Sequence, residues 1–166
     1  MSGNQGFLGW SQSIGAVPYV NIQDVKATNT AGGTFTSGAW RTRDLNTIQS
    51  DDAGICTLSN NQFTIPPGTY LIDARLPARA VAQHNARLQN ITAGTTTLNG
   101  STARTDAAQQ SQTDSFVNGR FRIYVATTFE VQHQCSTTLA TTGFGNPSNF
   151  TSTPEVYTVV ELWKIG

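Results

Sequence analysis

Two cysteines and two histidines are the side chains of this sequence with the widest chemical scope, as thiol nucleophiles, metal ligands or general bases. Cys56 and Cys135 lie far apart in the sequence, with no CxxC pair and no series of Cys and His residues at metal-ligand spacing near either of them. A strand would direct His133 and Cys135 to the same face, but a metal site would need a further ligand from elsewhere. We therefore expect no metal and two buried, reduced thiols, with a disulfide as the alternative.

The sequence shows no arrangement typical of an enzyme active site. Asp51 and Asp52 are adjacent, so their side chains diverge, whereas the paired carboxylates of glycoside hydrolysis face each other across roughly 5–10 Å. No GxSxG sequence occurs, and a Ser-His-Asp triad would have to use His84 or His133 without any local motif. Gly143–Gly145 (GFG) is a lone GxG without a following helical pattern, so it does not predict a phosphate-binding loop. We therefore expect a protein that is not an enzyme and uses no cofactor.

Arg41, Arg43 and Asp44 lie in a segment that we expect to form a strand. Strand alternation places both arginines on one face and Asp44 on the other. We prefer the interpretation that these charges pair within or between subunits and hold the strand in register. Because a guanidinium binds carboxylates in a bidentate fork, contact with an anion or an acidic sugar is the alternative.

The composition indicates one globular domain with a neutral, polar surface. The 166 residues can bury a core without disulfides, and 10 basic and 10 acidic side chains leave a formal net charge of zero. Only 12% of residues are charged, whereas Ser, Thr, Asn and Gln supply 61 of the 166. This deficit of charge argues against non-specific nucleic-acid binding, which needs a dense Lys/Arg surface. No apolar run approaches the roughly 20 residues that span a bilayer, so we expect neither a nucleic-acid partner nor membrane insertion.

From Val17 onward, short β-rich segments alternate with turn signals. Ala78–Asn90 contains helix-favouring Ala, Arg and Gln, but its residues alternate in character, so we expect a strand there too. Glu155–Ile165 (EVYTVVELWKI) is apolar on both faces, which predicts a central, buried strand. The other expected strands are Val17–Val25, Thr34–Trp40, Arg41–Ile48, Ile55–Leu58, Phe63–Ile65, Thr69–Leu76, Ser115–Val117, Arg120–Val125 and Thr127–Cys135.

Proline and glycine mark the expected ends of these strands. We expect Pro77 to end the strand that begins at Thr69, and residues 66–68 (PPG) to form a tight turn. Residues 98–100 (LNG) and the dipeptide Asn118-Gly119 are predicted hairpin turns. Residues 103–113 and 136–154 are expected to be exposed polar loops. Short strands with turns every 8–12 residues predict an all-β sandwich or barrel.

Several segments resemble the C1q/TNF-like jelly-roll domains of bacteriophage structural proteins, such as tail fibres and head spikes. In C1q/TNF-like domains a Phe-x-Val/Ile-Pro-x-Gly-x-Tyr hairpin precedes a core strand, and Phe63–Tyr70 (FTIPPGTY) fits it. The resemblance covers about Gly33–Ile165, and the order and spacing of the segments carry it. These segments are Trp40–Thr47, Asn61–Tyr70, Ala86–Asn90, Ser115–Phe121, Thr128–Cys135, Gly143–Gly145 and Glu155–Lys164.

The resemblance implies a jelly-roll β-sandwich over residues 16–166 that assembles as a homotrimer. It also implies a structural protein of a virion, made in the bacterial cytoplasm and released with a phage or phage-like particle. A monomeric sandwich is the alternative for the oligomeric state. A secreted C1q-like adhesion module is an alternative function, but the sequence has no collagen repeat and residues 1–15 do not read as a signal peptide.

Residues 1–15 are rich in Gly, Ser and Gln, with isolated bulky side chains at Phe7, Leu8 and Trp10. Exposed apolar side chains are costly unless they dock on a partner. This segment is therefore either an unstructured terminus or an arm that attaches the domain to other virion proteins.

Glycan binding commonly uses exposed aromatic rings for stacking and Asn, Asp or Arg for hydroxyl groups. The two long polar loops contain such residues, and two phenylalanines in a polar loop need a partner or local burial. The candidate glycan-binding residues are Arg104, Asp106, Phe144, Asn146, Asn149 and Phe150. We therefore expect a fibre or spike head that binds a host surface polysaccharide. A decoration protein that stabilises the particle without binding a receptor is the alternative.

Overall fold

The computed structural model describes residues 16–166, and in this range the chain forms strands, turns and loops without a helix. The predicted arm with Phe7, Leu8 and Trp10 lies outside the described residues. The strands are β1 (Tyr19–Lys26), β2 (Arg41–Thr42), β3 (Thr47–Asp51), β4 (Thr57–Ser59), β5 (Gln62–Ile65), β6 (Gly68–Arg79), β7 (Gln83–Asn90), β8 (Thr95–Arg104), β9 (Gln112–Ile123), β10 (Thr127–Cys135) and β11 (Glu155–Lys164).

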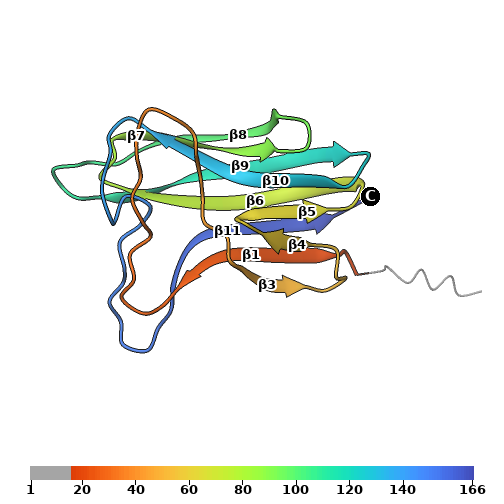
Figure 1. The fold of residues 1–166 in the computed structure, drawn as a ribbon, viewed down its shortest axis with the longest axis horizontal. Coiled ribbons are helices and arrows are strands. Elements are labelled where there is room, and N and C mark those ends of the chain that lie inside the picture. The colour runs from red at the N-terminus through yellow and green to blue at the C-terminus, as the bar shows by residue number, and fades with distance from the viewer. Residues whose placement is uncertain (1–15) are drawn as a thin grey trace, which may run out of the picture.

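The strands form two antiparallel sheets that pack face to face (Figure 1). The first sheet has the strand order β3-β1-β11-β6-β9. The second has the order β4-β5-β10-β7-β8, with β2 paired to β10. The predicted all-β jelly-roll sandwich is therefore confirmed.

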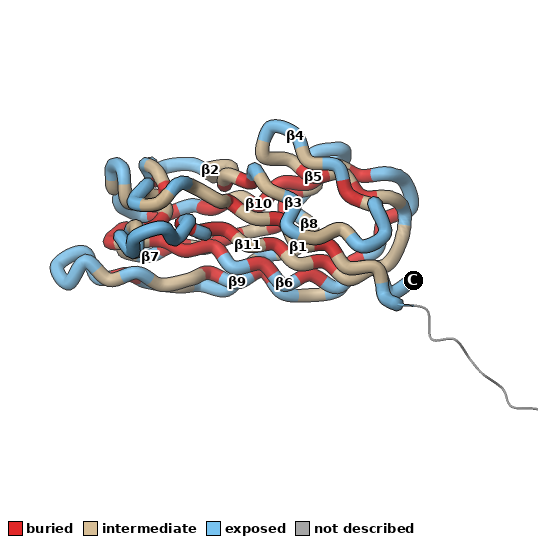
Figure 2. Tube along the Cα trace, turned by 90° about the horizontal axis from the view of Figure 1, so that it is seen from below, coloured by how far each residue is buried: buried red, intermediate tan, exposed pale blue. Residues whose placement is uncertain are grey.

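Alternating side chains from both sheets build the core between them. In β10, Phe129, Val131 and His133 are fully buried, and β10 has the bounds that the sequence predicts. The apolar strand β11 lies between β1 and β6, so its predicted central position is confirmed. Figure 2 shows the buried residues along the strands and the exposed ones at the turns of both ends. The main apolar cluster fills the middle of the sandwich and includes Val20, Ile22, Phe63, Tyr70, Leu88, Phe121, Phe129 and Leu162.

Proline does not end β6, which continues through Pro77 to Arg79. The last pair between β11 and β6 is Val159–Arg75, whereas β6 pairs with β9 as far as Arg79. At Pro77, β6 therefore has a neighbouring strand on one side only. On the side of β11 there is no partner strand at this position, so the missing N–H of the proline costs no hydrogen bond between strands.

Two predicted hairpin turns lie inside strands instead. Gly100 is within β8, and a Cβ atom there would come within 2.8 Å of the Phe116 carbonyl oxygen and 2.9 Å of the Ala86 carbonyl oxygen. Gly119 is within β9, where a Cβ atom would lie 3.2 Å from the Leu98 side chain. Both glycines therefore allow the two sheets to approach closely where β8 meets β9, and neither makes a turn.

The first long connection is less regular than the sequence predicts. Residues 34–40 form only an isolated bridge between Phe35 and Leu139 in place of a strand. The predicted strand Arg41–Ile48 is divided into β2 and β3, and the predicted strand over 78–90 is interrupted by a turn. In that turn Ala80 and Ala82 have φ values of 50° and 61°. From Gln83 onward the predicted alternation holds, with His84, Ala86 and Leu88 facing the core.

Both cysteines are free and buried, as predicted. Cys56 belongs to the main cluster, and Cys135 belongs to a smaller cluster around Phe35. Burial raises the pKa of the Cys56 thiol to about 12 and that of Cys135 to about 11. Both thiols are therefore protonated at neutral pH and poor nucleophiles.

Candidate functional site

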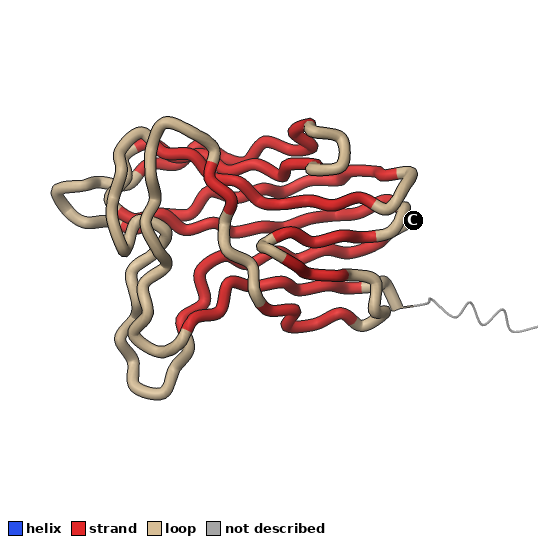
Figure 3. The backbone as a smooth tube through the Cα atoms, viewed as in Figure 1, coloured by secondary structure: helices blue, strands red, loops and turns tan. Residues whose placement is uncertain are grey.

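The long loops gather at one end of the sandwich, opposite the end at which β1 begins and the chain terminates (Figure 3). We call the two ends the loop end and the terminal end. The loop end is formed by residues 27–40, 80–82, 105–111 and 136–154. The two longest of these loops are joined by backbone hydrogen bonds, among them Gly32 N–H to the Gly145 carbonyl (3.0 Å) and Gly33 N–H to the Thr141 carbonyl (2.9 Å).

Phe150 and Asn149 lie in the part of the loop that Glu155 holds. The Glu155 carboxylate accepts backbone N–H groups from Ser148, Asn149 and Asn29 at 2.9 to 3.3 Å. The Ser148 N–H and the other donors lower the pKa of Glu155, so it is an anion at neutral pH. Phe150 is 69% exposed and is therefore a side chain that could stack on a ligand from solvent.

Asn146 is held at the start of β9 in the first sheet, and Asp106 lies in the loop that joins β8 to β9. The Asn146 N–H donates to Gln112 Oε1 (2.8 Å), which links the 136–154 loop to the start of β9. Asp106 closes its own turn by accepting the N–H groups of Ala108 (2.8 Å) and Gln109 (3.1 Å). Arg104 ends β8 with an exposed side chain. The six predicted residues therefore share the loop end, but these hydrogen bonds divide them between a Glu155 side and a Gln112 side.

Phe144 packs inward, which is the local-core alternative that the sequence left open. Its ring lies 4.4 Å from the Phe35 ring, and the Arg43 guanidinium lies 4.1 Å from its centroid. Of the two candidate phenylalanines, Phe150 is thus the one with a free ring.

Arg43 is completely buried beneath these loops. Its guanidinium donates to the Pro77 carbonyl (2.7 Å), the Phe144 carbonyl (3.0 Å) and Thr158 Oγ1 (3.0 Å). Burial lowers the pKa of Arg43 to about 9, so it is still charged at neutral pH. Arg43 is thus held inside the fold, as the preferred interpretation expects, but its partners are neutral carbonyl and hydroxyl groups in place of a paired charge. Its burial keeps it from an external anion.

A chain of hydrogen bonds runs from Arg43 through both histidines. Arg43 Nη1 lies 3.4 Å from His133 Nδ1, His133 Nε2 lies 2.9 Å from His84 Nδ1, and His84 Nε2 lies 2.9 Å from Thr113 Oγ1. Because a guanidinium only donates, His133 accepts at Nδ1 and donates from Nε2, and His84 does the same one step further. The Thr113 hydroxyl then donates to the Arg104 carbonyl (3.2 Å). Every member is satisfied when both imidazoles are neutral.

The charge states agree with this direction of donation. Burial and the Arg43 charge lower the pKa of His84 to about 4, and burial lowers that of His133 well below its usual value. The chain ends at a backbone carbonyl and contains neither a carboxylate nor a serine. Its chemistry is therefore that of a buried polar network in which two neutral histidines are anchored on the charged Arg43, without a nucleophile that a histidine could activate.

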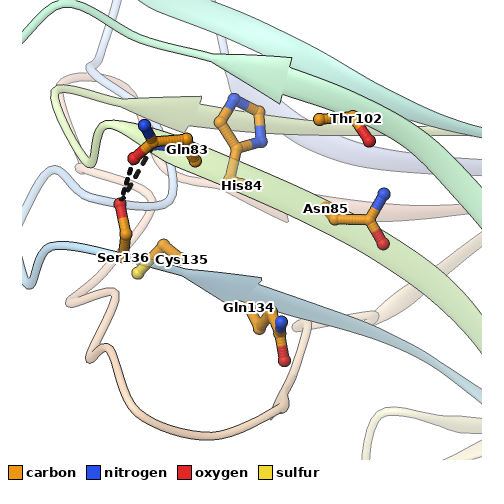
Figure 4. Close-up of a pocket in the computed structure, with 7 residues that line it drawn as sticks. All are labelled: Gln83, His84, Asn85, Thr102, Gln134, Cys135 and Ser136. Carbon is orange, nitrogen blue, oxygen red and sulfur yellow. Dashed lines mark hydrogen bonds between the residues drawn. The ribbon is translucent and has the colours of Figure 1, made fainter.

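A hollow of about 240 Å³ opens on the outer face of the second sheet, at its loop end (Figure 4). We call it the amide hollow because Gln83, Asn85 and Gln134 line it. Thr102 and Ser136 complete its rim, and the buried His84 and Cys135 belong to its floor. Sequence reasoning did not single out this site. The available signal was the alternation of amide residues along 83–89 and 130–134, but only strand pairing sets Asn85 opposite Gln134 and Thr102.

No group of three or more His, Cys, Asp or Glu side chains within residues 16–166 is arranged to hold a metal ion. No helix that could cross a bilayer occurs in the same range.

The fold and its loop end define a C1q/TNF-like jelly-roll domain. The solved structures similar to this chain include the PRD1 vertex protein P5, with a TM-score of 0.60 at 10% sequence identity, over 92% of this chain and 100% of that one. They also include the globular domain of zebrafish complement 1qA (TM-score 0.55, 12% identity, 90% and 98% coverage). Murine APRIL is similar as well (TM-score 0.57, 10% identity, 89% and 99% coverage). The sequence matches no family model and no curated protein.

Proposed function

We propose that this protein is a non-enzymatic structural component of a phage or phage-like virion whose loop end binds a polysaccharide on the host surface. The single observation that carries the proposal is the likeness in fold to the PRD1 vertex protein over nearly all of both chains. The placement of the loops supports it, since they lie at the end of the sandwich away from residue 16 (Figure 1). An arm at residues 1–15 would then join the particle at one end and leave the loops free at the other.

A homotrimer is part of the proposal, and the outer face of the first sheet is its proposed contact surface. Tyr19, Trp163 and Leu71 are neighbours across β1, β11 and β6, and the Tyr19 and Trp163 rings are 5.3 Å apart. Four residues along the strands, beyond the Glu161–Asp73 pair, Val159 and Phe116 flank Arg75 on the same face. Leu71 and Phe116 are 40% and 41% exposed. Exposed apolar side chains on one face favour burial against a second copy of the chain, in which the charged Asp73, Arg75 and Glu161 between them would need partners across the contact.

Asn21 adds a polar argument for the same face. Its Oδ1 atom is buried and has no hydrogen-bond donor among the described residues, while its Nδ2 donates to the Tyr19 hydroxyl (3.0 Å). A buried acceptor without a donor is unfavourable. We propose that the Asn21 side chain turns outward on assembly, so that a donor of the neighbouring subunit reaches this oxygen and removes that cost.

The first test is the mass of the purified protein by light scattering, followed by pull-down on host cells and on isolated capsule. We expect three times the 17.8 kDa of one chain and saturable binding that Phe150→Ala weakens. Phe116→Arg should give monomers, because each contact would then bury an unpaired charge, whereas Thr57→Arg on the other sheet should leave the trimer intact. A monomeric wild type would contradict the trimer.

Deletion of residues 1–15 should give a folded trimer that fails to join particles, and continued incorporation would contradict an attachment role.

A decoration protein without a receptor is the second candidate. The buried network of Arg43 and the two histidines agrees with this candidate, since it stabilises the loop end whether or not the loops bind sugar. A clean trimer that binds no host surface in the pull-down would favour this candidate.

A further inference from the structure

The amide hollow presents polar groups that the described part of the chain leaves without partners. The side chains of Gln134 and Thr102 make no hydrogen bond to any described residue, and Asn85 Oδ1 accepts none. The neighbouring groups are held in place: Asn85 Nδ2 donates to the Gly100 carbonyl (2.9 Å), and the Ser136 hydroxyl donates to Gln83 Oε1 (2.8 Å). Figure 4 shows these side chains around one opening, contributed by β7, β8 and β10. Asn85, Gln83 and Ser136 are thus held at the hollow, and the unpartnered groups of Gln134 and Thr102 beside them suit the hydroxyls of a polyhydroxylated ligand.

The hollow carries no charge at neutral pH. Its polar groups are amides and hydroxyls, and His84 in its floor is neutral because burial lowers its pKa to about 4. Further along β7 and β10, the outer face has one cation, Arg87, and one anion, Glu130, on separate rungs. Arg87 donates to Gln132 Oε1 (2.7 Å) and Thr96 Oγ1 (3.1 Å), and Glu130 accepts from Thr42 Oγ1 (3.0 Å) and Gln62 Nε2 (3.1 Å). These opposite charges are both engaged, so the surroundings favour neither an anionic nor a cationic ligand.

The size of the hollow limits the ligand to a small one. Pockets for drug-sized molecules run to roughly 300–1,000 Å³, and this one is about 240 Å³ and open to solvent. One sugar ring suits that volume, with its hydroxyls toward the amide rim. No aromatic ring lines the hollow, so a single contact should be weak and depend on several copies binding together.

From these observations we infer that the amide hollow is a saccharide subsite for one neutral hexose unit of a surface glycan, separate from the loop around Phe150. This inference rests on the proposed function, because it names the chemical class of glycan that the domain takes. Gln134 and Thr102 hydrogen-bond the sugar hydroxyls, and Asn85 accepts one through Oδ1.

The test uses the full chain on an array of immobilised glycans that end in neutral hexoses or in sialic or uronic acids. Titration with the best monovalent sugar then gives a dissociation constant. Gln134→Ala and Thr102→Val should each weaken binding about 2- to 10-fold, as expected for one neutral hydrogen bond. Thr57→Val is the matched control, because Thr57 is also an exposed threonine beside a polar hollow of the same sheet. It should bind as the wild type does.

A second measurement follows the Gln134 side-chain amide by ¹⁵N NMR, with the resonance assigned by its loss in Gln134→Ala. It should shift on addition of the neutral sugar. Neutral-sugar binding that neither Gln134→Ala nor Thr102→Val changes would overturn the subsite and leave the host-attachment proposal standing. Binding of acidic glycans alone would also overturn it. If no glycan binds while host cells still do, the subsite fails and attachment survives; if neither binds, both proposals fail.

Discussion

The interior of this sandwich has two unlike regions. From the terminal end to the middle, aromatic and branched side chains fill the space between the sheets, with Phe129 packed 5.8 Å from Phe63 and 5.3 Å from Phe121 by ring centroids. Toward the loop end, the apolar cluster shrinks to a few residues around Phe35, and the space is filled by Arg43, His133 and His84. Both regions are buried, but the first is held by packing and the second by directed hydrogen bonds.

This difference between the two regions explains why the long loops can be irregular. A polar network must satisfy each donor and acceptor, and Arg43 does so by binding the carbonyls of Pro77 and Phe144 and the hydroxyl of Thr158. These partners come from β6, the 136–154 loop and β11, so one side chain ties the loop to the two strands at the point where the ladder between β6 and β11 has ended. Packing alone could not do this for loops with little apolar surface.

The largest effect should come from Arg43→Ala. It leaves two buried carbonyls and a hydroxyl without their donor, and each unsatisfied buried group costs about 1–3 kcal/mol, so we expect the free energy of unfolding to fall by about 5 kcal/mol. Arg41→Ala is the control, because Arg41 is only part-buried and donates to loop carbonyls. Urea unfolding followed by fluorescence measures both. Equal losses for the two arginines would contradict the difference between the regions.

Phe129→Ala tests the apolar region. Removal of a fully buried ring should cost about 3–5 kcal/mol through lost transfer energy and a cavity. Because no titratable group is involved, the loss should be the same at pH 7 and pH 5. Phe150→Ala, at a 69% exposed ring, should change the stability little. A loss for Phe129→Ala that varies strongly with pH would show that the two regions are not separate.

The polar region should make the stability pH-dependent. The pKa of His84 is lowered in the folded state to about 4, below its ordinary 6.5, so the unfolded chain binds a proton that the folded chain refuses. The stabilisation is therefore complete above pH 6.5 and is lost as the pH falls toward 4. We expect a loss of about 3 kcal/mol from this histidine over that window. His84→Gln should show a smaller decrease than the wild type in urea unfolding at several pH values; parallel curves would exclude His84 as the cause.

The smallest effect should come from the end of the chain of hydrogen bonds. Thr113→Val keeps the shape of the side chain but leaves His84 Nε2–H without its acceptor, so we expect a loss of about 1–3 kcal/mol. Thr102→Val, at an exposed threonine without a partner, should stay within about 0.5 kcal/mol of the wild type. Thermal unfolding of the three proteins measures the difference. A Thr113→Val protein as stable as Thr102→Val would mean that the network ends at His84.

The sequence predicts strands with a strong alternating pattern well, but it does not predict the structural role of the glycines. Residues 127–135 have the expected bounds because their inward and outward sides differ clearly in polarity. Gly100 and Gly119 were assigned to turns, since a turn and a close approach between sheets both require glycine and a single sequence does not distinguish them. Residues 34–40 have enough β-favouring side chains for a strand, yet the partner they meet offers a single bridge at Leu139.

The sequence predicted which loops form the candidate site better than it predicted which of their side chains are exposed. Polar composition marked residues 103–113 and 136–154 as loops, and both lie at the loop end. Composition could not tell the exposed Phe150 from Phe144, because the burial of Phe144 depends on Phe35 and Arg43 from another loop and strand. The amide hollow was missed because its rim comes from three strands.

The sequence by itself determined the all-β class, the central apolar strand at the C-terminus and the inward sides of clearly alternating strands such as β7 and β10, because alternation and composition are local properties of the chain. It did not predict β8, whose residues are mostly polar on both faces. Only the tertiary structure decided which distant residues meet. His84 and His133 are 49 residues apart, and the antiparallel register of β7 and β10 brings them to 2.9 Å. That register depends on the packing of both sheets together. The buried histidine network and the amide hollow therefore arise from residues that show no motif along the chain.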